Sequence, residues 1–248
     1  MIRELLVALQ FLTRIPIRMS RAPTGLELGR SLLWYPLVGL LIGALLLVVH
    51  HVTAGIPPGV RASLLLVMWV LLSGAMHLDG LADTADAWAG GHGDRERTLG
   101  IMKDPRCGPM GVTVVVLLLL VKFASLSALI EVKNSAARTL VLAPFLGRAA
   151  LTALFFSTPY VRSSGVGLAL SAQAPRGPAA AIAACACAAV ALVAGREGLW
   201  ALVAAIGTFV LLRASAMRRI GGITGDVAGA LVELLEAVVL TTSAIGAA

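Results

Sequence analysis

The sequence is poor in charge, in aromatic residues and in cysteine. Charged residues make up 13% of its 248 residues and aromatic residues 5%, and there are three cysteines. Soluble domains carry about 25% charged residues, so the low charge excludes an ordinary water-soluble enzyme and a disordered chain. The cysteines do not form a disulfide framework or a C-x-x-C metal motif, because Cys185 and Cys187 lie two residues apart in an apolar, alanine-rich run.

The chain is rich instead in hydrophobic residues, which make up 58% of it. A membrane-spanning helix needs roughly 20 mostly apolar residues. The candidate spans are Leu32–His51, Val60–Met76, Met110–Ile130, Thr139–Ser157, Ala179–Ala194, Leu199–Leu212 and Val227–Ile245. The shorter amphipathic stretch Ile2–Ile15 predicts a helix in the membrane interface. We therefore predict an all-α, polytopic transmembrane helix bundle, with about seven spans plus this N-terminal helix, forming a single domain over residues 1–248.

The distribution of Lys and Arg predicts the orientation. With the N-terminus in the cytoplasm, 14 of the 20 basic residues fall on the cytoplasmic side, and Arg61, Lys133, Arg138 and Arg196 fall on the other. Cytoplasmic loops carry an excess of Lys and Arg, so the net charge of +7 indicates membrane topology rather than nucleic-acid binding. Seven spans then put the C-terminus outside. Segments 77–109, 158–178 and 213–226 are expected to be cytoplasmic.

The sequence HLDGLADTAD, residues 77–86, carries the main chemical signal. Asp79, Asp83 and Asp86 stand at i, i+4 and i+7 and so share one face of a helix. Because like charges at this spacing repel, a hard divalent cation such as Mg²⁺ would offset them. The alternative is a solvated acidic face, but the cluster lies where a span meets the cytoplasm. His77 points to nearly the opposite side and is expected to be a structural hydrogen-bonder.

Residues 101–111, IMKDPRCGPMG, predict a loop that re-enters the membrane, because Gly and Pro break helices. Lys103 and Arg106 can neutralise phosphate, the latter in bidentate fashion. Asp104 can add a metal ligand. The alternative is that these cations only flank a span, as the positive-inside pattern requires.

The sequence GGITGD, residues 221–226, opens the last span. Its glycines leave backbone N–H groups free at a helix N-terminus, which attracts anions. The candidate substrate-binding residues here are Gly222, Thr224 and Gly225. Asp226 is placed for a metal, and Glu233, which follows at i+7 on the same face, is a further candidate metal ligand.

Ionisable residues within spans are costly and usually functional. Glu233 and Glu236 lie in the last span, and Lys122 and Arg148 are the cations expected to pair with them. The alternative to a functional role is a structural ion pair. Arg162, in the segment 158–178, is either a phosphate contact or a topology charge.

There is no P-loop, no G-x-G-x-x-G and no nucleophile elbow. Carboxylates and arginines without a positioned nucleophile favour metal-assisted phosphoryl transfer. A secondary transporter would place its acids near the bilayer midplane, within an inverted repeat. The acids here gather at the cytoplasmic face instead, so transport is the less favoured interpretation.

The sequence resembles the cobalamin synthase family, the adenosylcobinamide-GDP ribazoletransferases, which are integral membrane enzymes. The stretches HLDGLADTAD and IMKD-x-R-x-G-x-x-G are the specific ones. The matching stretches are Phe11–Pro16, Trp34–Gly43, His77–Asp86, Ile101–Gly111, Pro159–Gly167 and Gly221–Glu233. The alternative is another membrane phosphotransferase of CDP-alcohol phosphotransferase type, but the strict motif of those enzymes is absent.

The resemblance implies a membrane transferase that joins adenosylcobinamide-GDP to α-ribazole, or to α-ribazole 5′-phosphate, with release of GMP. The product would be adenosylcobalamin or its 5′-phosphate. It implies Mg²⁺ on Asp79, Asp83 and Asp86, with Asp226 completing the site or acting as base. Asp104 is the other candidate base, and Lys103, Arg106 and Arg148 would neutralise the leaving GMP.

The resemblance also implies a place in the cell. It implies a multi-pass protein of a prokaryotic inner membrane, with the N-terminus and the active site in the cytoplasm. The lipid bilayer is a partner and nucleic acid is not. A homo-oligomer is compatible with this prediction.

Overall fold

The computed structural model describes residues 1–132, 135–193 and 195–247, which are helical and contain no β-strand. Lys133 and Ala194, which enter the predictions above, lie outside these residues. One isolated parallel bridge joins Tyr160 to Ile223. The helices are α1 (Ile2–Leu12), α2 (Gly25–Ser31), the 3-10 helix η1 (Leu32–Trp34), α3 (Tyr35–Val52), α4 (Pro58–Ser73), α5 (Met76–Gly90), α6 (Arg95–Ile101), α7 (Pro109–Glu131), α8 (Ser135–Ser157), α9 (Val166–Ala172), α10 (Arg176–Val193), α11 (Gly195–Ile220) and α12 (Gly225–Ala247).

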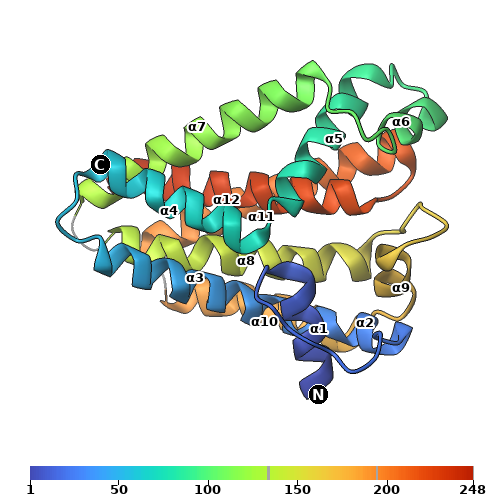
Figure 1. Ribbon diagram of the computed structural model, residues 1–248, viewed down its shortest axis with the longest axis horizontal. Coiled ribbons are helices and arrows are strands. Elements are labelled where there is room, and N and C mark those ends of the chain that lie inside the picture. Colours follow the sequence, from blue (N-terminus) through green and yellow to red (C-terminus); the bar gives the residue numbers. More distant parts are fainter. Residues whose placement is uncertain (133–134, 194, 248) are drawn as a thin grey trace.

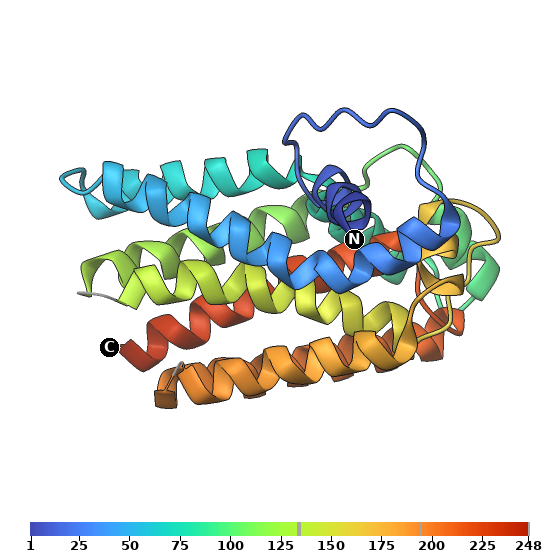
Figure 2. The ribbon, with the colours of Figure 1, turned by 90° about the horizontal axis from the view of Figure 1, so that it is seen from below.

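The long helices lie side by side along the longest axis of the molecule, and α1 lies across them (Figures 1 and 2). Helix α12 is the centre of the bundle. It contacts α5, α7, α8 and α11, and 67% of its most apolar stretch is buried. The position of α1 across the bundle is the one expected of an interfacial helix.

Five described helical segments are long and apolar enough to cross a membrane, and two sharply bent helix pairs raise the number to seven. The five contain the predicted spans that begin at Leu32, Met110, Thr139, Leu199 and Val227. The remaining two predicted spans correspond to α4, with 16 residues, and to α10. Because α4 is only about 24 Å long, it does not cross a hydrocarbon core of about 30 Å by itself. The predicted multi-pass helical bundle is confirmed.

The predicted span Val60–Met76 is interrupted before its end. Helix α4 ends at Ser73, and α5 leaves at 87° to it. Gly74 and Ala75 both have positive φ, at 64° and 57°. A side chain at Gly74 would collide with that of Arg14, whose backbone N–H donates to Leu72 O at 2.8 Å. The N-terminal segment therefore holds the bend that turns α5 across the end of the bundle.

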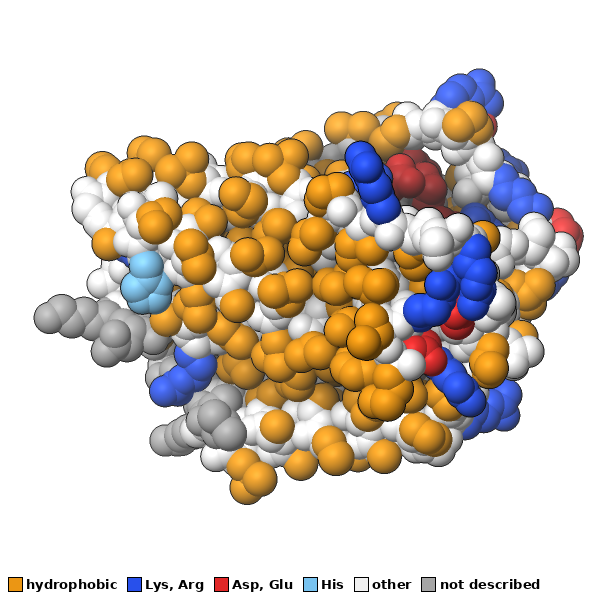
Figure 3. All heavy atoms as spheres, turned by 60° about the horizontal axis from the view of Figure 1, so that its bottom comes forward, with side chains coloured by type: hydrophobic (Ala, Val, Ile, Leu, Met, Phe, Trp, Pro, Cys, Tyr) orange, Lys and Arg blue, Asp and Glu red, His pale blue; other side chains and the backbone are white. Residues whose placement is uncertain are grey.

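Charged side chains gather at one end of the molecule, where α5, α6 and α9 lie (Figure 3). We call this the polar end. The loop between α8 and α9 and the junction of α11 with α12 lie there too, since Arg162 bonds Met102 O and Arg95 bonds Ile220 O, both at 3.0 Å. The three segments predicted to be cytoplasmic thus meet at one end of the bundle.

Helices α3 and α8 pack closely through a G-x-x-x-G pattern. A Cβ at Gly39 would lie 2.5 Å from Pro144 O, and one at Gly43 would lie 2.7 Å from the Cα of Val141. Small residues at this spacing let two membrane helices approach backbone to backbone.

We expect Gly39→Ala to lower the free energy of unfolding by about 1–3 kcal/mol, because the backbones of α3 and α8 must separate. The matched control is Gly207→Ala in α11, where no described atom lies within 4 Å of the added Cβ. That change should be neutral or should stabilise by up to about 1 kcal/mol. Thermal unfolding in detergent measures both, and equal effects at the two positions would contradict the packing.

Candidate active site

Two glycines bring α5 and α12 into close contact at the polar end. A Cβ at Gly80 would lie 2.8 Å from Asp226 O, and one at Gly229 would lie 3.2 Å from the Cα of His77. The missing side chains let the first turn of α12 lie against α5. This contact brings Asp79 of α5 and Asp226 of α12 to the same cavity.

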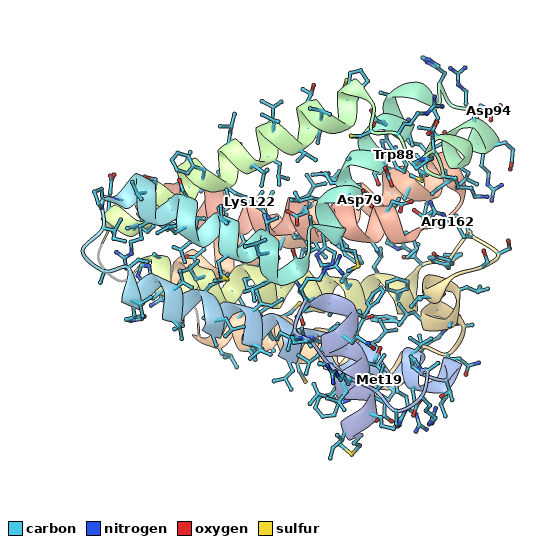
Figure 4. The ribbon with its side chains drawn as sticks, in the orientation of Figure 1. Met19, Asp79, Trp88, Asp94, Lys122 and Arg162 are labelled. Carbon is cyan, nitrogen blue, oxygen red and sulfur yellow. The ribbon has the colours of Figure 1, made fainter. Side chains whose placement is uncertain are left out.

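That cavity, which we call the carboxylate cavity, has a volume of about 180 Å³. It is bordered by α1, α5, α8, α9 and α12. Asp79 lies where α5 crosses toward α12, and Arg162 lies beyond it at the polar end (Figure 4). The polar lining of the carboxylate cavity is formed by Asp79, Asp226 and His77.

The predicted aspartate face is present on α5, and Asp226 joins it. Asp83 lies in the electrostatic field of Asp79, Asp86 and Asp226, and of Arg162. The Arg162 guanidinium donates to Asp226 Oδ2 at 2.5 Å and to Met102 O at 3.0 Å. Arg162 is therefore a direct neighbour of the carboxylates and ties the loop before α7 to the start of α12.

Asp86 has a different role from its two neighbours. Its Oδ2 accepts the backbone N–H of Gly108 at 2.7 Å, and its Oδ1 accepts that of Gly111 at 2.9 Å. These two N–H groups lie at the start of α7, where they have no acceptor within the helix. A carboxylate is a favourable acceptor for them. A Cβ at either glycine would lie 2.5 Å from an Asp86 oxygen. The glycines of the G-x-x-G sequence are therefore required for Asp86 to anchor α7.

Asp104 and Arg106 pair with each other rather than with the carboxylate cavity. The guanidinium donates from Nε at 2.9 Å and from Nη2 at 2.7 Å. These bonds lower the pKa of Asp104 to about 2, so its carboxylate is a poor proton acceptor at neutral pH. This favours another carboxylate as the base. The Arg106 side chain is 87% exposed and lies in solvent.

A second, polar cavity of about 340 Å³ lies beside the first. We call it the basic cavity, because Arg95, Lys103 and Arg162 line it, with Glu96 as its acidic member. Arg162 borders this cavity and bonds Asp226 of the other, so it lies between the two. Lys103, a predicted phosphate contact, lines this cavity, and so does Arg95, which was not predicted.

The segment before α12 is held by its own contacts. A Cβ at Gly222 would lie 2.3 Å from Pro159 O, and the N–H of Ile223 donates to that same oxygen at 2.8 Å. Thr224 is fully buried, donates to Asp226 Oδ2 and accepts the N–H of Val227. Of the three predicted substrate-binding residues in this segment, only Gly225 lines the carboxylate cavity. Gly222 and Thr224 position Asp226 instead.

Four charged side chains form a buried network about halfway along the bundle, around Lys122 (Figure 4). Lys122 Nζ donates to Glu233 at 2.6 Å and to Glu236 at 2.7 Å. Arg148 bonds the other oxygen of Glu236. Each of the four is at most 4% exposed. The predicted ion-pair partners are confirmed, and two cations balance two anions across α7, α8 and α12.

This network changes two functional predictions. Glu233 was predicted as a metal ligand, but Lys122 holds it two helical turns away from Asp226. Arg148 was predicted to contact the leaving group, but it is buried against Glu236. Both side chains are paired within this network, away from the carboxylate cavity, and leaving either charge unpaired at this depth would cost several kcal/mol, about 3–5 in soluble proteins.

His77 was expected to point away from Asp79 as a structural hydrogen-bonder. Its place in the wall of the carboxylate cavity was not predicted, and its buried Nδ1 has no hydrogen-bond partner among the described residues. Phe155 and Leu170 line the same cavity and were also missed. No sequence signal marks them, since apolar residues of this kind occur throughout the chain.

The described residues contain no preformed cage of three His, Cys, Asp or Glu side chains around one metal position. Mg²⁺ is usually held by one or two carboxylates together with substrate phosphates, so a two-carboxylate cavity fits its preferences. Asp79 and Asp226, with Asp83 nearby, supply oxygen donors of the right kind.

The fold and the site define a multi-pass helical membrane protein with an acidic cavity and a basic cavity side by side at one end. Comparison with known proteins narrows this class. A family model described as cobalamin-5-phosphate synthase matches residues 4–244. The chain belongs to this family.

Curated relatives agree over nearly the whole chain. Adenosylcobinamide-GDP ribazoletransferase of Pseudomonas entomophila is 53% identical over 94% of this chain and 95% of its own length. The enzymes of the same name from Pseudomonas savastanoi and Stutzerimonas stutzeri are 55% and 54% identical, over 96% and 95% of this chain and 98% and 95% of their own lengths. No solved structure matches the chain.

Gly111→Ala tests the anchoring role of Asp86. The added Cβ would lie 2.5 Å from Asp86 Oδ2 and 3.0 Å from Ala82 O, so α7 must move away from α5. We expect turnover to fall by about tenfold or more, because small displacements at a site cost large factors in rate.

The matched control is Gly59→Ala. It lies in the first turn of α4, where the closest side-chain atom to the added Cβ is 3.9 Å away. Steady-state turnover in liposomes measures both variants. Full activity of Gly111→Ala would show that Asp86 does not depend on this contact.

Proposed function

We propose that this chain joins adenosylcobinamide-GDP to α-ribazole, or to α-ribazole 5′-phosphate, and releases GMP. The observation that carries the proposal is the family match over residues 4–244, with relatives of that activity at 53–55% identity. The products are adenosylcobalamin or its 5′-phosphate. The two adjoining cavities of opposite charge support this reaction, because it brings a diphosphate to an acceptor hydroxyl.

The reaction is an exchange at phosphorus. A ribose hydroxyl of the acceptor forms a bond to the cobinamide-side phosphorus, and the bond from that phosphorus to the bridging oxygen breaks. GMP leaves with the bonding electron pair, and the hydroxyl proton passes to a carboxylate of the site. Asp226 and Asp79 border the cavity in which this proton is released, whereas Asp104 is kept ionised by Arg106.

Asp79, Asp83 and Asp226 would hold Mg²⁺ in this reaction. The ion, when bound, would neutralise phosphate charge that builds up in the transition state. We assign Asp86 to the anchoring of α7 instead, since each of its oxygens accepts a backbone N–H group from the start of that helix. Glu233 stays out of this set because Lys122 holds it deeper in the bundle.

We assign the diphosphate and the nucleotide of the donor to the basic cavity. Arg95 and Lys103 give it positive charge, and Arg162 connects it to Asp226. Arginine suits phosphate because its planar fork donates two parallel hydrogen bonds. The scissile phosphorus would then lie at Arg162, between the two cavities.

We place the protein in a prokaryotic inner membrane, with the polar end in the cytoplasm. The gathering of basic side chains at that end supports this orientation (Figure 3). Lipid contacts the apolar sides of the long helices, which expose residues such as Leu117, Leu120 and Val203.

Purified protein in liposomes tests the proposal, with adenosylcobinamide-GDP and α-ribazole as substrates, with Mg²⁺ or with a chelator. We expect GMP release and corrinoid product only with Mg²⁺. Asp79→Asn should lower turnover by about 10²-fold or more, because it removes a charge at the reacting phosphate. Product from CDP-diacylglycerol, with none from adenosylcobinamide-GDP, would overturn the proposal.

Asp94→Asn is the matched control for this experiment. Asp94 caps α6 through Oδ1, which accepts the N–H of Arg97 at 2.8 Å, and asparagine caps a helix as well as aspartate does. The same change of charge outside the carboxylate cavity should leave turnover unchanged. Equal losses in the two variants would mean that the effect is not specific to the site.

A further inference from the structure

The lining of the carboxylate cavity is chemically mixed. Asp79, Asp226 and His77 are its polar residues. Its apolar residues include Phe11 of α1, Leu151 and Phe155 of α8, and Leu170 of α9. Phe155 is held in place by stacking on Tyr160, with ring centroids 6.2 Å apart. A ligand that fits this cavity has a flat apolar part and a polar part with hydroxyl groups.

His77 supplies a second, independent sign of a ligand. His77 is only 3% exposed, and no atom of the described residues forms a hydrogen bond with its Nδ1. Leaving such a group unpaired costs about 1–3 kcal/mol, and buried polar groups are therefore nearly always satisfied. Because His77 is part of the cavity wall, a bound molecule can supply the missing partner.

The volume of the cavity limits the size of that molecule. At about 180 Å³ it is slightly larger than the roughly 150 Å³ engineered cavity that takes benzene. It therefore holds an aromatic base, and it is too small for a corrin macrocycle. Both substrates of the proposed reaction contain flat aromatic bases. The purines of the donor carry exocyclic amino or oxo groups that an apolar wall would leave unpaired, whereas the benzimidazole base of the nucleoside has no such groups.

We infer that the carboxylate cavity is the acceptor site, which takes the benzimidazole base of α-ribazole against Phe155 and Leu170. The ribose then faces Asp79 and Asp226, and the imidazole of His77 hydrogen-bonds to the nucleoside. This inference rests on the proposed function and adds the location of one substrate to it. The corrinoid of the donor lies outside this cavity.

The first test measures the KM of each substrate in turn. His77→Leu should raise the KM of α-ribazole by about tenfold or more, because a buried hydrogen bond is lost, and should leave that of adenosylcobinamide-GDP unchanged. His77→Asn, whose amide nitrogen can take the place of Nδ1, should recover most of the affinity. A rise confined to the KM of the donor would overturn the inference.

A second variant fills the cavity without disturbing the fold. Gly225 lines the cavity, and no described atom lies within 4 Å of a Cβ added there. Gly225→Leu should therefore raise the KM of α-ribazole, because the added side chain would occupy part of the cavity. The matched control is Gly177→Leu, also in the first turn of a long helix and also with open space around its Cβ. It should leave both KM values unchanged.

Equilibrium binding of α-ribazole to the detergent-solubilised protein, without donor or Mg²⁺, separates this inference from the proposed function. The wild type should bind, and Gly225→Leu and His77→Leu should bind about tenfold more weakly. If the wild type turns over but these variants bind α-ribazole normally, the acceptor lies elsewhere while the function stands. If the wild type binds α-ribazole but forms no product from either donor, the function fails while the cavity assignment stands.

Discussion

The close contact of α5 with α12 is the constraint on which the site depends. It exists because Gly80 and Gly229 carry no side chain, so that the backbone of one helix touches the other. The 87° turn between α4 and α5 makes the contact possible, and Arg14 packs against the glycine of that turn. As a result, a carboxylate from each helix borders one small cavity.

Two sets of charged groups, at different depths in the bundle, have different roles. The buried set, around Lys122, is balanced and paired, and it joins α7, α8 and α12 at a depth where an unpaired charge would be costly. The set at the polar end is crowded with like charges, and Arg162 is the cation that directly contacts Asp226. Excess negative charge at a cavity wall favours a bound cation, which can in turn attract a phosphate, whereas a balanced network stabilises only the fold. The same residue types therefore serve structure in one place and chemistry in the other.

The sequence predicts the spans, the gathering of three loops at one end and the aspartate face, because composition and helical spacing determine them. It does not predict the turn at Ala75, since a positive φ at alanine has no sequence signature. The partners of Asp86 are 22 and 25 residues away, so its anchoring role depends on tertiary contact. The place of His77 in the cavity wall was not predicted, because its angle from Asp79 on one helix says nothing of the other helices that complete the cavity. Helix periodicity thus predicts the helix face on which a residue lies, but not the elements that pack against that face.

The most direct test of this account is a double-mutant cycle on turnover in liposomes, with Asp79→Asn, Asp226→Asn and the double variant. If the two helices build one site, the carboxylates act as a unit, and the second substitution should cost little once the first is made. The account predicts a double variant within about threefold of the slower single variant. Losses that multiply fully would contradict it, because they would mean that Asp79 and Asp226 act independently and that the α5–α12 contact does not assemble the active site.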